Sequence, residues 1–200
     1  EEPKNMGAWE YMGYRLKKLV GMNLPVNYVG RRRSSSPAEG SSTAHKTNQA
    51  MIIEYAFNWK FDKEADYVST KKADYNKDEP GRGDKWATAW VADRKSRFEP
   101  DFIELFEKNC SLKLGSFPSA KYTMTINTTR TEPGFNIVMM KKNAQIDLEI
   151  TITETGSNKV IAEYTVLKSP GRTFGMGDLD TGVRIRESYA TAGKYFGKQL

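Results

Sequence analysis

The sequence predicts an α+β fold of two layers, in which two helices cover one face of a mostly antiparallel sheet of about four strands. Two patterns support this prediction. Residues 145–153 alternate between apolar and polar side chains, as a half-buried strand does. Residues 185–200 carry apolar side chains at helical spacing, as an amphipathic helix does. The predicted order of elements is β-α-β-β-β-α, after an N-terminal extension with a short helix and a loop.

The chain has 200 residues, of which 38% are hydrophobic and 28% are charged. This length favours one domain with an appended segment, and the composition is typical of a globular protein. No run of about 18 apolar residues occurs, so no transmembrane helix is predicted. The chain opens Glu1-Glu2-Pro3-Lys4 without a methionine, which favours a mature or trimmed product.

The first 48 residues differ in character from the rest of the chain. Residues 6–20 predict a short amphipathic helix, because their larger apolar side chains share one helical face: Trp9, Met12, Leu16, Leu19 and Val20. Residues 30–48 are rich in Ser, Gly and Arg and lack apolar periodicity, which predicts an exposed loop. A loop of this length is unusual inside a compact domain. We therefore divide the chain into an extension, residues 1–48, and a single α/β domain, residues 49–200.

The first half of that domain predicts one strand and several helices. Residues 51–61 begin as an apolar run and then alternate, which predicts the first core strand. A polar stretch follows, with a short helix expected over residues 65–73. Trp86 and Trp90 lie at helical spacing. A further helix is predicted over residues 99–109, with Pro100 in its first turn, where the missing N–H costs nothing.

The second half predicts three strands and a closing helix. Residues 122–128, 146–152 and 160–166 alternate apolar and polar side chains, which implies an antiparallel sheet with one face in water. The closing helix is expected over residues 180–200, with Asp178 or Asp180 as its N-cap. Together with the 99–109 helix it should cover the apolar sheet face through one stripe of side chains: Ile185, Tyr189, Ala192, Phe196 and Leu200.

The formal net charge is +6, from 31 basic and 25 acidic residues. Most basic residues are interleaved with acidic ones, except for the run Arg31, Arg32 and Arg33, which is followed by Lys46 in the same Ser-rich segment. Such a cluster can bind a polyanion through its phosphates or carboxylates. The predicted exposed strand face carries Asp147 and no aromatic platform, so nucleic acid is not the partner that we expect.

The loop Gly171–Gly177 lies between a predicted strand and a predicted helix, where glycine-rich loops can bind phosphate. A dinucleotide-binding fingerprint would require a glycine at position 180, which is Asp180, and no Gly-Lys-Ser/Thr sequence is present. A flexible connector is the alternative interpretation.

Two pairs of acids could serve acid–base chemistry. Asp101 and Glu104 are one helical turn apart, and Asp147 and Glu149 share one face of a strand. Surface acids at these spacings are commonplace.

The single cysteine, Cys110, is expected to be a small buried hydrophobe, and the sequence has no second cysteine for a disulfide. We therefore predict no catalytic residue, no metal site and no cofactor.

The second half also resembles a known group of proteins. Residues 144–153, Thr155-Gly156, residues 159–164, the glycine-rich loop and the final helix are similar to exported bacterial lipoprotein-type domains related to the periplasmic domain of curli-secretion channels. The shape expected of them is that of the amino-terminal domain of TolB. The resemblance implies an exported protein, periplasmic or associated with the outer membrane. It also implies an interaction or assembly module without catalytic residues.

These observations lead to one hypothesis and two alternatives. The hypothesis is a non-enzymatic envelope protein that binds a protein partner or associates with itself, with peripheral association with the outer membrane. The first alternative is a protein that binds nucleic acid or another polyanion through Arg31–Arg33 and Lys46. The second is a hydrolase that uses Asp101 and Glu104.

Overall fold

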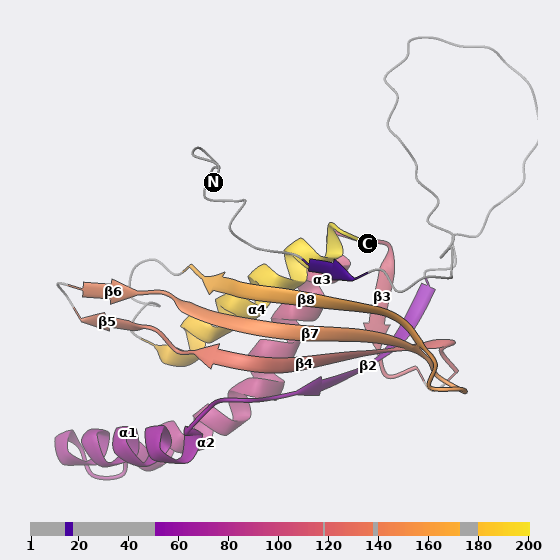
Figure 1. Ribbon diagram of the computed structural model, residues 1–200. Coiled ribbons are helices and arrows are strands. Elements are labelled where there is room, and N and C mark those ends of the chain that lie inside the picture. Colours follow the sequence, from indigo (N-terminus) through magenta and orange to yellow (C-terminus); the bar gives the residue numbers. More distant parts are fainter. Residues whose placement is uncertain (1–14, 18–50, 118, 138–139, 173–179) are drawn as a thin grey trace, which may run out of the picture.

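A six-stranded sheet forms one layer of the fold, and helices cover one of its faces (Figure 1). The computed structural model describes residues 15–17, 51–117, 119–137, 140–172 and 180–200. Within these residues the strand order is β1-β8-β7-β4-β2-β3. The strands of this sheet are β1 (Arg15–Lys17), β2 (Met51–Asn58), β3 (Leu112–Gly115), β4 (Tyr122–Glu132), β7 (Ala144–Glu154) and β8 (Val160–Gly171).

The middle of the sheet is antiparallel, and one side of it is parallel. Strand β7 pairs antiparallel with β4, where Ile152 faces Met124, and also with β8. Strand β2 pairs in parallel with β4, where Phe57 faces Ile126, and with β3 on its other side. Parallel neighbours need a crossover connection. The helices between β2 and β3 supply it.

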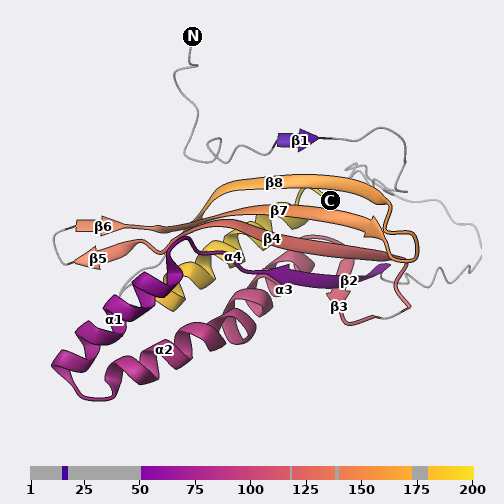
Figure 2. The same ribbon diagram turned by 60° about the horizontal axis from the view of Figure 1, so that its bottom comes forward.

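Three helical segments follow β2 directly. They are α1 (Glu64–Asp78), α2 (Arg82–Asp93) and α3 (Glu99–Glu107), with the π-helical turn η1 (Arg94–Phe98) joining the last two. Figures 1 and 2 show α1 and α2 as an antiparallel hairpin that extends away from the sheet. Pro100 has no N–H to donate to the carbonyl of Ser96. The wider π turn just before it lets the helix continue through this position.

The core lies between the sheet and the pair α3 and α4 (Thr181–Gly197). Aromatic side chains of α3 and α4 are among the most deeply buried, with Phe102, Phe106 and Phe196 at 1% exposure or less. Alternate residues of β4 and β7 meet them from the sheet: Met124, Ile126, Ile146, Leu148, Ile150 and Ile152. Burying each such side chain contributes roughly 1.5–3 kcal/mol, so this layer holds the helices on the sheet.

Glycines on α4 set how closely the two covering helices approach. A Cβ at Gly193 would lie 2.2 Å from the carbonyl oxygen of Phe102, and one at Gly197 would lie 2.6 Å from that of Phe106. Both positions face the backbone of α3. Only glycine permits this contact, which brings α3 and α4 side by side over the sheet.

A small separate sheet extends the molecule at one end. Strands β5 (Phe135–Ile137) and β6 (Met140–Lys142) form an antiparallel pair that projects beyond β4 and β7 (Figure 1). Ile137 and Met140 are about 60% exposed there.

The predicted fold class is confirmed. The structure is α+β, and strands β2, β4, β7 and β8 correspond to the four that the sequence predicts. Of the two predicted N-caps, Asp178 and Asp180, the structure has Asp180, whose carboxylate accepts hydrogen bonds from the amides of Gly182 and Val183. The helix expected over residues 6–20 is wrong where the structure describes it, since Arg15–Lys17 form a strand paired with β8. The other residues of that expected helix, and the loop at 30–48, lie outside the described residues.

The close contact between α3 and α4 gives a direct test. We expect Gly193→Ala to lower the free energy of unfolding by about 1–3 kcal/mol, because the added methyl group must push the helices apart. An alanine in an unhindered helix would instead stabilise by about 0.5–1 kcal/mol. Urea denaturation measures the change. The control is Gly156→Ala, where nothing lies within 4 Å of the new Cβ, and we expect a change within about 0.5 kcal/mol. Equal stability of the two variants would contradict the prediction.

Candidate functional site

Several residues that the sequence singled out lie outside the described part of the chain. These are Arg31, Arg32, Arg33 and Lys46, together with most of the Gly171–Gly177 loop. Gly171 itself is described. A Cβ there would lie 1.9 Å from the carbonyl oxygen of Arg184, so this glycine is required for close packing of β8 against α4.

The acids Asp101 and Glu104 do not form a catalytic pair. Asp101 forms an ion pair with Arg186 at 3.1 Å, and Glu104 pairs with Lys108 one turn further along α3. Burial raises the pKa of Asp101 and outweighs the opposing effect of the Arg186 guanidinium. Each acid therefore has its own basic partner. Neither acid lines the cavity at the start of α4.

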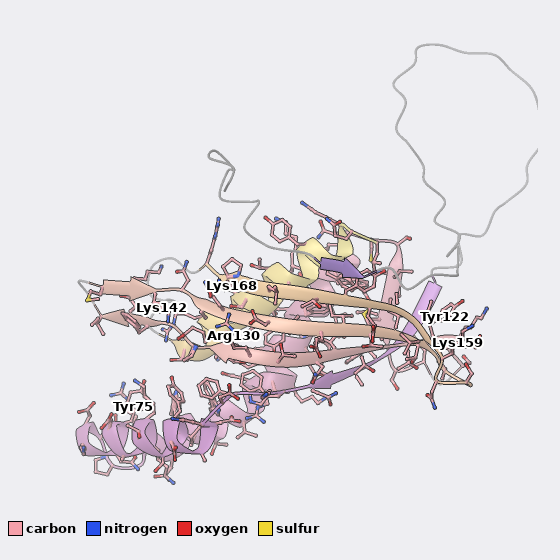
Figure 3. All side chains as sticks on the ribbon, in the orientation of Figure 1. Tyr75, Tyr122, Arg130, Lys142, Lys159 and Lys168 are labelled. Carbon is pink, nitrogen blue, oxygen red and sulfur yellow. The ribbon has the colours of Figure 1, made fainter. Side chains whose placement is uncertain are left out.

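Asp147 is a structural acid on the open face of the sheet. Its carboxylate accepts hydrogen bonds from Arg130 Nε at 2.6 Å, from Arg130 Nη2 at 3.1 Å and from the amide of Lys168 at 2.6 Å. Burial raises the pKa of Asp147, but the hydrogen bonds outweigh it and the net shift is downward. Figure 3 shows Arg130 and Lys168 near one another on neighbouring parts of the sheet. An acid held ionised in this way does not serve as a general acid.

Cys110 is less buried than the small buried hydrophobe that the sequence predicts. It is half-buried after α3, and burial raises the pKa of its thiol, which favours the neutral form. Among the described residues no group of three or more His, Cys, Asp or Glu side chains could hold a metal ion. No helix of the described chain is long and apolar enough to cross a membrane.

The structure contains a cavity of about 330 Å³ that the sequence patterns did not reveal. It lies where the α1–α2 hairpin meets the first turn of α4. Its wall is formed by side chains of the hairpin: Tyr75, Arg82, Trp86, Ala89 and Trp90. Its floor is formed by residues from the end of α2, from η1 and from the start of α4: Asp93, Arg97, Asp180, Thr181 and Gly182.

The local sequence explains why the hairpin forms the wall. Gly81 takes a left-handed conformation, with φ of 83°, at the turn between α1 and α2. Gly83 then packs directly against α1, where a Cβ would lie 2.1 Å from the carbonyl oxygen of Lys72. Asn76 fixes the turn, since its side-chain oxygen accepts a hydrogen bond from the amide of Gly83 at 2.7 Å. These contacts place Tyr75 opposite Trp86, with ring centroids 5.7 Å apart.

Glu64 holds the hairpin on the domain. Its carboxylate accepts hydrogen bonds from Trp59 Nε1 at 3.0 Å and from Trp90 Nε1 at 2.6 Å, and it forms an ion pair with Arg94. The Arg94 guanidinium also lies over the Trp59 ring, at 4.9 Å from the centroid. Since α1 has no fully buried residue, this cluster and the aromatic contacts of Tyr67 and Tyr75 attach it.

The floor of the cavity carries two carboxylates and one guanidinium. Arg97 forms ion pairs with Asp93 and with Asp180, both at 3.1 Å. Burial raises the pKa of Asp93, Arg97 lowers it, and the Asp180 carboxylate raises it, with a net upward shift. The arrangement combines an aromatic wall with an excess of negative charge on the floor. It is suited to binding a small ligand.

The first part of the chain matches a known enzyme family. Residues 1–57 match the family model described as the C-terminal part of 2-oxoglutarate dehydrogenase. Curated relatives are 2-oxoglutarate dehydrogenase E1 components. The protein from Exiguobacterium sp. is 59% identical over 58 residues, and the protein from Geobacillus kaustophilus is 54% identical over 56 residues. These matches cover 29% and 28% of this chain and 6% of each relative.

Two solved structures are similar to the chain at low sequence identity. A DUF330 protein from Xanthomonas campestris is 13% identical, with a TM-score of 0.38, and the match covers 51% of this chain and 58% of that one. The PelC dodecamer from Paraburkholderia phytofirmans is 9% identical, with a TM-score of 0.37, and the match covers 82% and 93% of the two chains.

The family match corrects several expectations from the sequence patterns. The prediction of a non-catalytic envelope module is wrong, because residues 1–57 match the family model of an enzyme's C-terminal part, and curated relatives that are components of this enzyme are 44–59% identical over 53–61 residues. For the same reason the predictions of a non-enzyme and of an exported, periplasmic or outer-membrane-associated protein are wrong. The Arg31–Arg33 run, read as a polyanion-binding segment, lies inside the matched residues. The spacing of apolar residues does not indicate this relationship, because the relationship is detected only by comparing residue identities with those of other proteins.

The Glu64 cluster predicts a large effect of a single substitution. We expect Glu64→Ala to lower the free energy of unfolding by about 1–3 kcal/mol, because two indole N–H groups and a guanidinium lose their acceptor. Denaturation followed by tryptophan fluorescence measures the change. The matched control is Asp66→Ala, in the same helical turn and exposed, with an expected change of about 0.5 kcal/mol or less. Similar losses in both variants would show that the cluster does not anchor α1.

The lowered pKa of Asp147 predicts a pH dependence. Its contribution to stability is present above the unfolded-state pKa of about 3.9 and is lost as the pH falls through the lower folded-state value. We therefore expect Asp147→Asn to destabilise the protein at pH 7 and to reduce the loss of stability at acid pH. Urea midpoints between pH 2 and pH 7 measure this effect. Glu149→Gln, an exposed neighbour, is the control, and a pH profile of Asp147→Asn identical to the parent would refute the assignment.

Proposed function

We propose that this chain is part of a 2-oxoglutarate dehydrogenase E1 component. The match of residues 1–57 to the C-terminal part of that enzyme, at up to 59% identity, is the observation that supports the proposal. The chain matches about 6% of the length of the curated relatives. Oxidation of 2-oxoglutarate therefore requires the rest of an E1 component. We propose that residues 1–57 bind this remaining part of the E1 component.

We also propose that residues 49–200 form one folding unit. Strand β2 supports this, because it lies between β4 and β3 and its first seven residues, 51–57, still belong to the matched segment. The side chains of Tyr55 and Phe57 pack against the core. The end of the matched segment and the start of the α+β domain thus share one strand.

We also propose that residues 96–200 share the fold of the periplasmic domains of curli-secretion channels. The α+β class and the strand–strand–helix order of the second half support it.

A replacement experiment tests the proposed function. In the Exiguobacterium E1 component, the 58 matched residues are replaced by residues 1–200 of this chain. We expect the resulting enzyme to keep most of its 2-oxoglutarate dehydrogenase activity, because the identical residues restore the contacts of the replaced segment. Steady-state turnover of 2-oxoglutarate is the measurement.

The matched control carries residues 49–200 at the same position, so that it keeps the α+β domain and lacks most of the matched segment. We expect its activity to be at least about tenfold lower, equivalent to about 1.4 kcal/mol in the activation free energy. Size-exclusion chromatography shows whether each enzyme assembles. Equal activity of the two replacements, or an assembled but inactive enzyme with residues 1–200, would overturn the proposal.

A further inference from the structure

The cavity between the helical hairpin and α4 has an aromatic wall. Tyr75 on α1 and Trp86 and Trp90 on α2 follow one another, with centroid distances of 5.7 Å and 5.5 Å between successive rings. Trp90 is 3% exposed, whereas Tyr75 and Trp86 remain partly open to the solvent. Figure 3 places Tyr75 on the hairpin, away from the sheet. Faces of Trp and Tyr rings attract cations.

The floor of the same cavity is negatively charged. The carboxylates of Asp93 and Asp180 share a single guanidinium, that of Arg97. Asp93 is only 6% exposed, and it reaches the start of α4 because Gly182 has no Cβ, which would lie 2.0 Å from its Oδ2 atom. On the floor, two negative groups and one positive group leave an excess of one negative charge, since the Arg82 guanidinium on the wall is paired with Asp78.

An anion is disfavoured at this floor. The first amides of α4 could otherwise hold one, but Asp180 already accepts the hydrogen bonds of Gly182 and Val183, at 2.7 Å and 3.3 Å. The pKa of Asp93 is raised by burial and by repulsion from Asp180. A cation placed beside the two carboxylates would offset that repulsion.

The rim shows that a cation fits against this wall. The Arg82 guanidinium lies over the Tyr75 ring, at 4.8 Å from its centroid. Its charge is balanced by Asp78, at 3.8 Å, and both side chains are at least half exposed. The wall therefore already supports one cation–π contact within the chain.

We propose that this cavity binds a small organic cation, with its ammonium group between the Trp86 ring and the carboxylates of Asp93 and Asp180. The volume of about 330 Å³ lies within the range of small-molecule sites. The site is independent of the proposed function. 2-Oxoglutarate carries two carboxylates, so it is repelled by this floor and is not its ligand.

Choline and its uncharged isostere 3,3-dimethylbutan-1-ol test the proposal on the full chain. The two probes share shape and differ in charge. Tryptophan fluorescence and calorimetry measure binding. We expect choline to bind saturably and the isostere to bind about tenfold more weakly. We expect 2-oxoglutarate not to bind. Equal affinity for choline and the isostere, no saturable binding of choline, or binding of 2-oxoglutarate at the same site would overturn the proposal.

Two variants separate the site from the fold. Asp180→Asn removes one charge and keeps a good N-cap, so α4 should be preserved while choline affinity falls severalfold. Trp86→Leu should weaken choline binding in the same direction. The control is Val91→Ala, on α2 but 60% exposed and outside the cavity, which should leave the affinity unchanged. Thermal melting by circular dichroism confirms the fold of each variant. Unchanged choline affinity in folded Asp180→Asn would refute the assignment.

Discussion

The structure depends on how closely α4 can approach its neighbours. Gly193 and Gly197 bring it against the backbone of α3, Gly171 brings β8 against it, and Gly182 admits the Asp93 carboxylate. Three of these contacts along α4 therefore bring backbone against backbone, and the fourth brings the α4 backbone against a carboxylate. Because α3 and α4 lie side by side, their aromatic side chains point together into the sheet, where Phe102, Phe106 and Phe196 fill the core. A wider spacing would leave part of the apolar face of the sheet uncovered.

The same packing creates the cavity beside the first turn of α4. The first turn of α4 meets the end of α2 through Gly182 and Asp93, and the hairpin then extends past this junction. Glu64 and its indole partners fix the angle at which the hairpin leaves the domain. The core and the cavity are thus consequences of one arrangement: close contacts at α4 produce both the closed layer over the sheet and the recess at its end.

Much of this fold could be predicted from the sequence, and the reasons are physical. Ile146, Leu148 and Ile150 alternate because every second side chain of β7 enters the core, and Tyr189 and Phe196 share a stripe because α4 buries one face. β3 was missed, since its four residues are too few to show a period. The cavity was missed as well, because its floor joins residues 93–97 to residues 180–182, which no local pattern connects. The similarity of residues 1–57 to an enzyme is detected from residue identities and cannot be detected from the spacing of apolar residues.

The position of β2 has a consequence for how the chain folds during synthesis. Its parallel partners are β3, where Met51 faces Leu112, and β4, where Asn58 faces Asn127. Each pairing spans about sixty residues or more, so β2 leaves the ribosome long before either neighbour exists. Pairing over such distances is slow, and an unpaired apolar strand is prone to aggregate. The α1–α2 hairpin is made of local contacts and can form first. The hydrogen bond between Glu64 of this hairpin and Trp59, which follows β2 directly, would then hold the unpaired β2 near the place where the sheet assembles.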